Sequence, residues 1–128
     1  MLITTSTRRS VEELAERVPK ACSEEKFGVL GTIDLRAKLR EKGQPYDRAC
    51  LVFEVCRPDV ARQALEASPE VSTALPCRIA VFERTDGTRE LATIRPRDLL
   101  GLVGAPGLEA AADDVERSLR AIMEKAAR

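Results

Sequence analysis

Two cysteines stand at the ends of apolar segments, each close to a proline, and they are the clearest candidates for chemistry in this sequence. Cys56 ends the apolar part of FEVCRP, with Pro58 two residues later, and Cys77 follows Pro76 in LPCRIAVFE. A thiol near a helix N-terminus or a cation ionises more easily, and the thiolate is a nucleophile and a soft metal ligand. The first hypothesis is therefore a thiol site at the ends of two strands.

Charged side chains beside the two cysteines extend this candidate site. Guanidinium groups would favour a thiolate if they turned toward the sulfur, although neighbours along a strand point to opposite faces. The alternative is that both cysteines are small residues that fill tight corners where strands enter and leave a sheet. The candidates for ligand binding or redox chemistry are Cys56, Cys77, Arg57, Arg78 and Glu54.

Several kinds of active site are excluded because the chain has no histidine. Ser-His-Asp and Cys-His mechanisms within one chain are impossible, and a zinc site of four ligands is not predicted. An enzyme would be limited to thiol or carboxylate chemistry, with Cys56, Cys77, Glu54 or Glu83 as the available groups. No catalytic residue, metal or cofactor is assigned.

Composition indicates one globular domain over residues 1–128. Hydrophobic residues make up 44% and charged residues 33%, and 21 Lys and Arg balance 21 Asp and Glu. Nucleic-acid binding depends on a basic surplus and on stacking aromatics, so no nucleic-acid partner is expected. No apolar run is long enough to cross a membrane, and MLITTSTRRS does not have the pattern of a signal peptide. We therefore expect a cytoplasmic location with reduced thiols and no membrane partner.

Apolar spacing, caps and turn residues predict an α+β fold with an antiparallel sheet. Ser10 and Glu13 form a capping box, and Asp86-Gly87 favours a hairpin turn. Cys22 and Cys50 are expected in the core. Strands are predicted over residues 1–7, 27–33, 48–56, 77–83 and 90–94. Helices are predicted over residues 11–25, 35–42, 58–67 and from 108 onward. Irregular connections are predicted over residues 68–76 and 96–107.

Three segments resemble the domain of unknown function 302 family. They are FGVLGTIDLRAKLREKG, PYDRACLVFEVCRPDVARQALEASPEVSTALPCRIAVFE and PRDLLGLVGAPGLE, within a resemblance that runs from about residue 10 to the C-terminus. The most specific parts are the Cys-x-Pro step at Cys56 and the Pro-Cys step at Cys77. Where relatives often have asparagine, this chain has Arg57 and Arg78.

The resemblance implies a fold similar to that of the TATA-binding protein. It would have a curved antiparallel sheet of about five strands, with the long C-terminal helix packed across it. The order would be β-α-β4-α-like, with extra short helices. Family members tend to form dimers, so the resemblance also implies a homodimer. The family has no agreed activity, and the resemblance therefore leaves the function open.

The relative position of the two cysteines depends on the direction of their strands. If strands 48–56 and 77–83 are antiparallel neighbours, Cys56 and Cys77 lie at the same rim of the sheet, within roughly 10 Å of each other. A parallel arrangement would separate them by roughly 20 Å. Helix 58–67 rises about 15 Å, and residues 68–76 are just long enough to bring the chain back. We therefore expect both thiols at one rim, close enough to share a ligand.

The expected function is ligand binding or sensing by a small homodimer with a thiol-lined site and a possible small-molecule ligand. Two alternatives remain open, namely a structural or partner-binding dimer without a ligand and a thiol-dependent enzyme. The segment CRIAVFE favours a dimer because both of its faces are apolar. The predicted helices are too few to cover both faces, so a second copy of the chain is expected to cover one of them.

Overall fold

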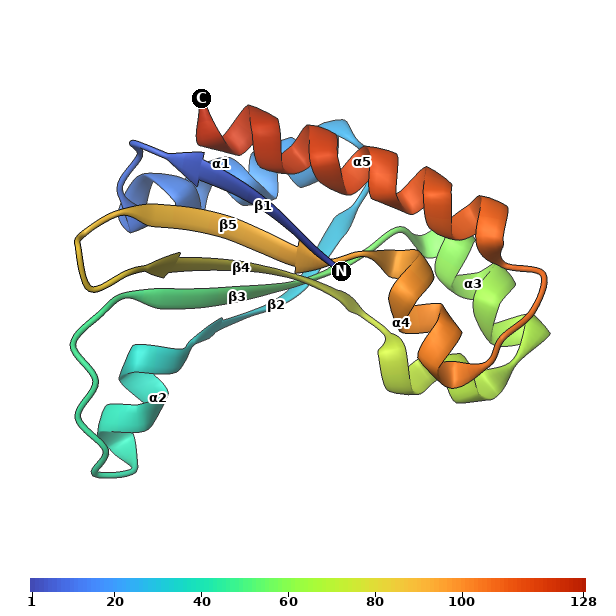
Figure 1. Ribbon diagram of the computed structural model, residues 1–128, viewed down its shortest axis with the longest axis horizontal. Helices are drawn as coiled ribbons and strands as arrows, with labels where there is room; N and C mark the ends of the chain where they lie inside the picture. Colours follow the sequence, from blue (N-terminus) through green and yellow to red (C-terminus); the bar gives the residue numbers. More distant parts are fainter.

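Five strands and six helical segments form the fold, and the computed structural model describes all residues from 1 to 128 (Figure 1). In chain order they are β1 (Leu2–Thr7), α1 (Val11–Glu24), β2 (Gly28–Asp34), α2 (Leu35–Glu41), β3 (Cys50–Cys56), α3 (Pro58–Ala67), the 3-10 helix η1 (Pro69–Ala74), β4 (Cys77–Glu83), β5 (Arg89–Ile94), α4 (Pro96–Val103) and α5 (Glu109–Ala127). The strands form one open antiparallel sheet in the order β1-β5-β4-β3-β2. The predicted α+β fold, with an antiparallel sheet and a long C-terminal helix, is confirmed.

Helix α1 begins where the sequence predicts because side chains cap its first turn. The Ser10 hydroxyl accepts a hydrogen bond from the Glu13 amide at 3.1 Å, and the Glu13 carboxylate accepts one from the Ser10 amide at 3.2 Å. Apolar residues then recur every three or four positions and bury one side of the helix. Cys22 is on that side and has no exposed surface, so its predicted place in the core is confirmed.

Two segments predicted to be irregular are helical, and those two predictions are wrong. Residues Pro69–Ala74 form η1, and residues Pro96–Val103 form α4. Proline is well suited to the first helical position, where its fixed φ fits and its missing N–H costs nothing. Gly104 ends α4 with a φ of 72°, which a residue without Cβ adopts freely. These prolines and this glycine therefore mark helix ends.

Helices α1 and α5 pack against each other and cover one face of the sheet (Figure 1). Alternate strand residues point to this face, and Phe53, Val55, Ile79 and Val81 are almost completely buried there. Helix α5 supplies five members of the same core, which are Val115, Leu119, Ile122, Met123 and Ala126. This main core contains 18 buried residues and holds the sheet and the two helices together.

The last turn of α5 is hydrogen-bonded to the N-terminal part of the chain. Arg17 of α1 donates to the carbonyl oxygens of Ala126 at 2.8 Å and of Lys125 at 3.0 Å. The Thr7 hydroxyl donates to the carbonyl oxygen of Ala127 at 2.8 Å. Carbonyl groups at a helix C-terminus have no partner within the helix. These contacts therefore satisfy them and join α5 to β1 and α1.

The opposite face of the sheet has no helix across it. In Figure 1, α2 extends from one end of this face, and α3, α4 and η1 gather at the other end. The side chains that line the middle of the face are largely apolar and include Val52, Ala80, Phe82, Ala92 and Ile94. Both faces of β4 are therefore apolar, as the sequence indicates, but helices of the chain cover only one of them.

A second, smaller core lies at the end of the sheet between α3, η1, α4 and the start of α5. Its four buried residues are Ala64, Val71, Ala105 and Leu108. Leu75 and Leu100 pack against it from the side. Because apolar burial is the main stabilising contribution, this small core is held together much less strongly than the main core.

Substitutions in the main core should lower stability much more than substitutions at the surface. Leu119 on α5 has no exposed surface, so Leu119→Ala should lower the free energy of unfolding by about 2–5 kcal/mol through lost burial and a residual cavity. Leu102 on α4 is 78% exposed, and Leu102→Ala should change it by less than about 0.5 kcal/mol. Urea unfolding followed by circular dichroism measures both. Equal effects of the two substitutions would contradict this assignment of the core.

Candidate functional site

Strands β3 and β4 bring Cys56 and Cys77 to the same rim of the sheet. The two strands are antiparallel neighbours, and Cys77 lies directly opposite Val55, the residue before Cys56. The predicted antiparallel pairing and the predicted shared rim are therefore confirmed. The register also decides where the two side chains point, because residues directly opposite each other share a face.

The two thiols point to different faces of the sheet. Cys77 shares the helix-covered face with Val55, which is completely buried, and it packs against the main core. Side chains alternate along a strand, so Cys56 faces the opposite way. Cysteines whose Cβ vectors point apart cannot be bridged without movement of the backbone. The geometry therefore gives no support to a disulfide between them, and each thiol has its own surroundings.

Burial raises the pKa of all four thiols. The pKa of Cys22 and that of Cys77 rise from 9.0 to about 11, and a negative charge on nearby Cys56 adds to the effect at Cys77. Burial also raises the pKa of Cys50, and burial followed by the charge of Asp59 raises the pKa of Cys56. The expectation that α3 and a neighbouring arginine would favour the Cys56 thiolate is therefore wrong. Near neutral pH these groups are thiols.

Arg57 is occupied by two carboxylates and does not act on Cys56. Its guanidinium lies 3.0 Å from Asp59 and 3.4 Å from Asp114 on α5. Hydrogen bonding to Asp59 raises the pKa of Arg57, and the same contact lowers the pKa of Asp59. Arg57 therefore connects the end of β3 to the start of α3 and to α5.

The remaining candidates lie on separate faces or play a structural part. Arg78 is exposed and lies directly opposite Glu54, on the face of the sheet without helices. Glu83 accepts a hydrogen bond from the Ala49 amide at 3.0 Å and so fixes the chain just before β3. Cys50 is half-buried and lies opposite Phe82 on the open face, so the prediction that it belongs to the core is wrong. The functional roles proposed for Cys56, Cys77, Arg57, Arg78 and Glu54 stay predictions.

Cys77 lines a small apolar cavity, named here the Cys77 cavity. It has a volume of about 40 Å³ and lies between the sheet rim and helices α3, α4 and α5. Twelve of its thirteen lining residues are hydrophobic, among them Val60, Leu75, Leu100 and Val115. A site of this composition has no charged group to hold a polar ligand, so it suits an apolar chain.

A larger groove, named here the sheet groove, crosses the open face of the sheet. It has a volume of about 390 Å³, and nine of its thirteen lining residues are hydrophobic. Arg78 is the one charged residue among them. Ligand sites in proteins are typically hollows of about 300–1,000 Å³ lined by apolar side chains with a few polar groups. The size and composition of the sheet groove fall in that range.

The sheet groove and the Cys77 cavity are neighbours. Ala74, Leu75 and Leu99 line both, so these side chains of η1, the segment after it and α4 are the partition between the two hollows. The sequence did not suggest these three residues because the segments that carry them were predicted to be irregular. Helices η1 and α4, and the turn from η1 into β4, place them beside the rim that carries the two cysteines.

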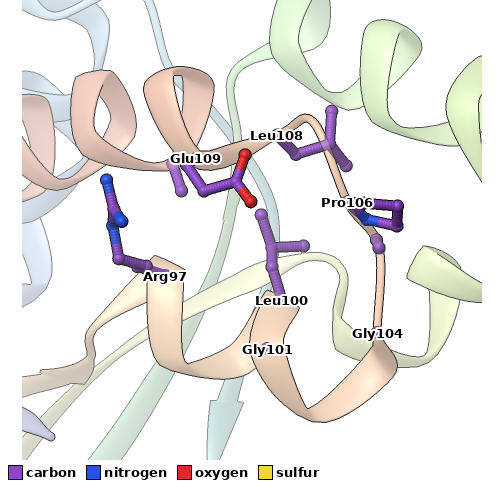
Figure 2. Close-up of a pocket in the computed structure, with 9 residues that line it drawn as sticks. Arg97, Leu100, Gly101, Gly104, Pro106, Leu108 and Glu109 are labelled. Carbon is purple, nitrogen blue, oxygen red and sulfur yellow. The ribbon is translucent and has the colours of Figure 1, made fainter.

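A third hollow, named here the outer hollow, lies between α4 and the start of α5 and has a volume of about 380 Å³ (Figure 2). Figure 2 shows Arg97 rising from α4 toward α5, Glu109 reaching from α5 toward α4, and Leu100 of α4 pointing into the space between the two helices. Arg97 is already bound by Asp113 through two contacts of 3.0 and 2.7 Å. The outer hollow therefore offers no unpaired cation to a ligand.

Comparison with known proteins gives the family of the chain. Residues 3–126 match the family described as Domain of unknown function DUF302. The chain belongs to this family. A crystal structure of an uncharacterized conserved DUF302 protein from Bacillus stearothermophilus is 30% identical to this chain and superposes with a TM-score of 0.91. The match covers 99% of this chain and 98% of that one. No curated protein shows significant similarity.

Membership of the DUF302 family confirms the resemblance drawn from the sequence. The further likeness to the fold of the TATA-binding protein stays a prediction, since the matched structure is described only by its family.

No helix is long and apolar enough to cross a membrane. No three His, Cys, Asp or Glu residues lie together in a way that could hold a metal ion.

The pKa of the Cys77 thiol predicts how stability depends on pH. Because burial raises this pKa from 9.0 to about 11, the folded state keeps a proton that the unfolded state loses. The contribution is present in full below about pH 9 and is lost as pH rises through about 11. At pH 11 the loss at this one group should be about 2 kcal/mol.

The comparison of native protein with Cys77→Ala isolates this thiol from the other groups that titrate at high pH. Cys77→Ala should have a lower free energy of unfolding than native protein at pH 7, and this difference should be smaller at pH 10.5. Urea unfolding at pH 7, 9 and 10.5 measures the free energy of unfolding of both proteins. A difference that stays constant over this range would show that Cys77 is not held in the protonated form.

Proposed function

We propose that this DUF302 protein is a binding module for a small apolar ligand. The observation that carries the proposal is the sheet groove of about 390 Å³, which adjoins the thiol-lined Cys77 cavity. A ligand in the groove would lie on Ala80 and Ala92, which are paired directly opposite each other and leave space above the sheet. Its apolar end would meet the Leu75 and Leu99 partition.

The packing beside the partition supports this proposal. The small core against which Leu75 packs has only four buried residues, so moving Leu75 would disturb little apolar burial. Local opening is easiest where few buried contacts must be broken. The apolar lining of the cavity also suits a hydrocarbon chain that enters from the groove. A thiol-dependent enzyme is less well supported, because burial raises the pKa of every thiol.

We further propose that the module is a homodimer joined along β2 and α2. Helix α2 has seven residues and none of them is buried, although isolated helices of this length are unstable in water. Leu30, Leu35 and Leu39 are exposed on β2 and α2, and β2 is an edge strand. An edge strand that pairs with its own copy about a two-fold axis gives a self-complementary antiparallel contact. Since the groove is lined from β1, β5, β4 and β3, this contact leaves it open.

Ligand binding is tested with the neutral apolar fluorophore N-phenyl-1-naphthylamine. Native protein should enhance its fluorescence, and Ala80→Phe should weaken binding at least fivefold because the added ring fills the floor of the groove. Ala110 is exposed on α5 outside every hollow described above, so Ala110→Phe is the matched control and should bind as native protein does. Native mass spectrometry would add the mass of any ligand that purifies with the protein. No enhancement by native protein would contradict the proposal.

The homodimer is tested by size-exclusion chromatography with light scattering. Native protein at micromolar concentration should have twice the mass of the 14.1 kDa chain. The double substitution Leu35→Glu and Leu39→Glu should give the mass of one chain, since it places charge on the proposed contact without touching a buried residue. Leu102→Glu, at an exposed leucine on α4, should remain a dimer. If native protein has the mass of a single chain, the proposed homodimer is wrong.

A further inference from the structure

We propose that the ligand of the sheet groove is an apolar molecule that ends in a carboxylate, with Arg78 as the group that binds the carboxylate. This inference rests on the ligand-binding function proposed above and names the class of ligand. The groove combines an apolar floor with one cation, Arg78. A carboxylate matches that cation in charge, and a guanidinium can donate two parallel hydrogen bonds to its two oxygens.

Arg78 is available because nothing in the chain neutralises it. Its side chain is exposed and takes part in no ion pair or hydrogen bond, while its backbone carbonyl accepts a hydrogen bond from Thr93. Arginines on neighbouring elements are all occupied. Arg57 pairs with Asp59 and Asp114, Arg95 with Glu116, and Arg97 with Asp113.

The nearest acidic residue on the same face turns away from Arg78. Glu54 lies directly opposite Arg78 across the β3–β4 pair, yet the two form no ion pair. A Cβ atom placed on Gly31 of β2 would lie 3.4 Å from Oε1 of Glu54, so the carboxylate extends toward β2, on the far side of β3 from Arg78. The absence of a side chain at Gly31 leaves room for this position. The guanidinium is therefore left for an acid from outside the chain.

The shape of the groove sets the place of the apolar part of the ligand. The paired alanines Ala80 and Ala92 form a low floor, and Leu2, Phe82 and Ile94 line the groove beside them. Leu75 and Leu99 close the groove on the side of the Cys77 cavity. A hydrocarbon chain attached to the carboxylate would lie on this surface, and its end would lie against the partition.

A single negative charge fits the groove better than a phosphate does. Phosphate sites combine several cations or the backbone N–H groups of a helix N-terminus, because the group carries more charge and more acceptor oxygens. The sheet groove has one arginine and strand backbone whose hydrogen bonds are used within the sheet. A monocarboxylate is therefore the class of acid that the chemistry favours.

The test compares octanoate with 1-octanol by isothermal titration calorimetry on the full chain at pH 7.5. The two probes have the same hydrocarbon chain, and only octanoate is charged. Native protein should bind octanoate about tenfold more tightly than octanol, since a charge-assisted hydrogen bond adds to the shared apolar contact. Arg78→Gln should remove this preference and leave octanol binding unchanged.

Two variants serve as controls for the charge. Arg62 is an exposed arginine on α3, outside the sheet groove, so Arg62→Gln should keep the full preference for octanoate. Arg78→Lys keeps the charge but loses the two-pronged geometry, and it should keep part of the preference. Thermal unfolding checks that each variant folds as native protein does.

The possible outcomes separate this inference from the proposed function. If native protein and Arg78→Gln bind both probes with equal affinity, the inference that Arg78 binds a carboxylate is wrong. The proposed apolar binding site would still be supported. Binding of neither probe would overturn both.

Discussion

One-sided burial of the sheet is the constraint on which the rest of the structure depends. Helices α1 and α5 cover one face and bury Phe53, Val55, Ile79 and Val81 against Leu119 and its neighbours. With the helices confined to one side, the other face keeps apolar residues such as Phe82 and Ile94 at the surface. The main core and the proposed binding surface therefore belong to opposite faces of the same strands.

The elements at the end of the sheet give this open face a groove. Helices α3 and α4 and the short η1 add a small core, and their side chains bound the sheet groove where a bare sheet would be flat. Because alternate residues of a strand point to opposite faces, adjacent residues Cys77 and Arg78 serve different hollows. The rim of β4 thus supplies a thiol to the apolar Cys77 cavity and a cation to the sheet groove.

The sequence was informative where local patterns decide the structure and less so where packing decides it. The Ser10 and Glu13 box, the apolar stripe of α5 and the strand CRIAVFE predicted their elements and the antiparallel rim that unites Cys56 and Cys77. The partition residues Leu75 and Leu99 could not be predicted, since they belong to segments whose prolines and glycines read as breaks. The raised thiol pKa values also depend on burial, which no local motif reports.

The bonds from Arg17 and Thr7 to the last carbonyl groups of α5 join the two ends of the chain. Five of the 18 residues of the main core come from α5, between Val115 and Ala126. During synthesis α1 covers only part of the helix face of the sheet, and the rest of that face stays exposed until α5 has been made. Helix α1 can complete its packing only after α5 has been made. The apolar surface that is exposed before then makes the nascent chain a substrate for chaperones.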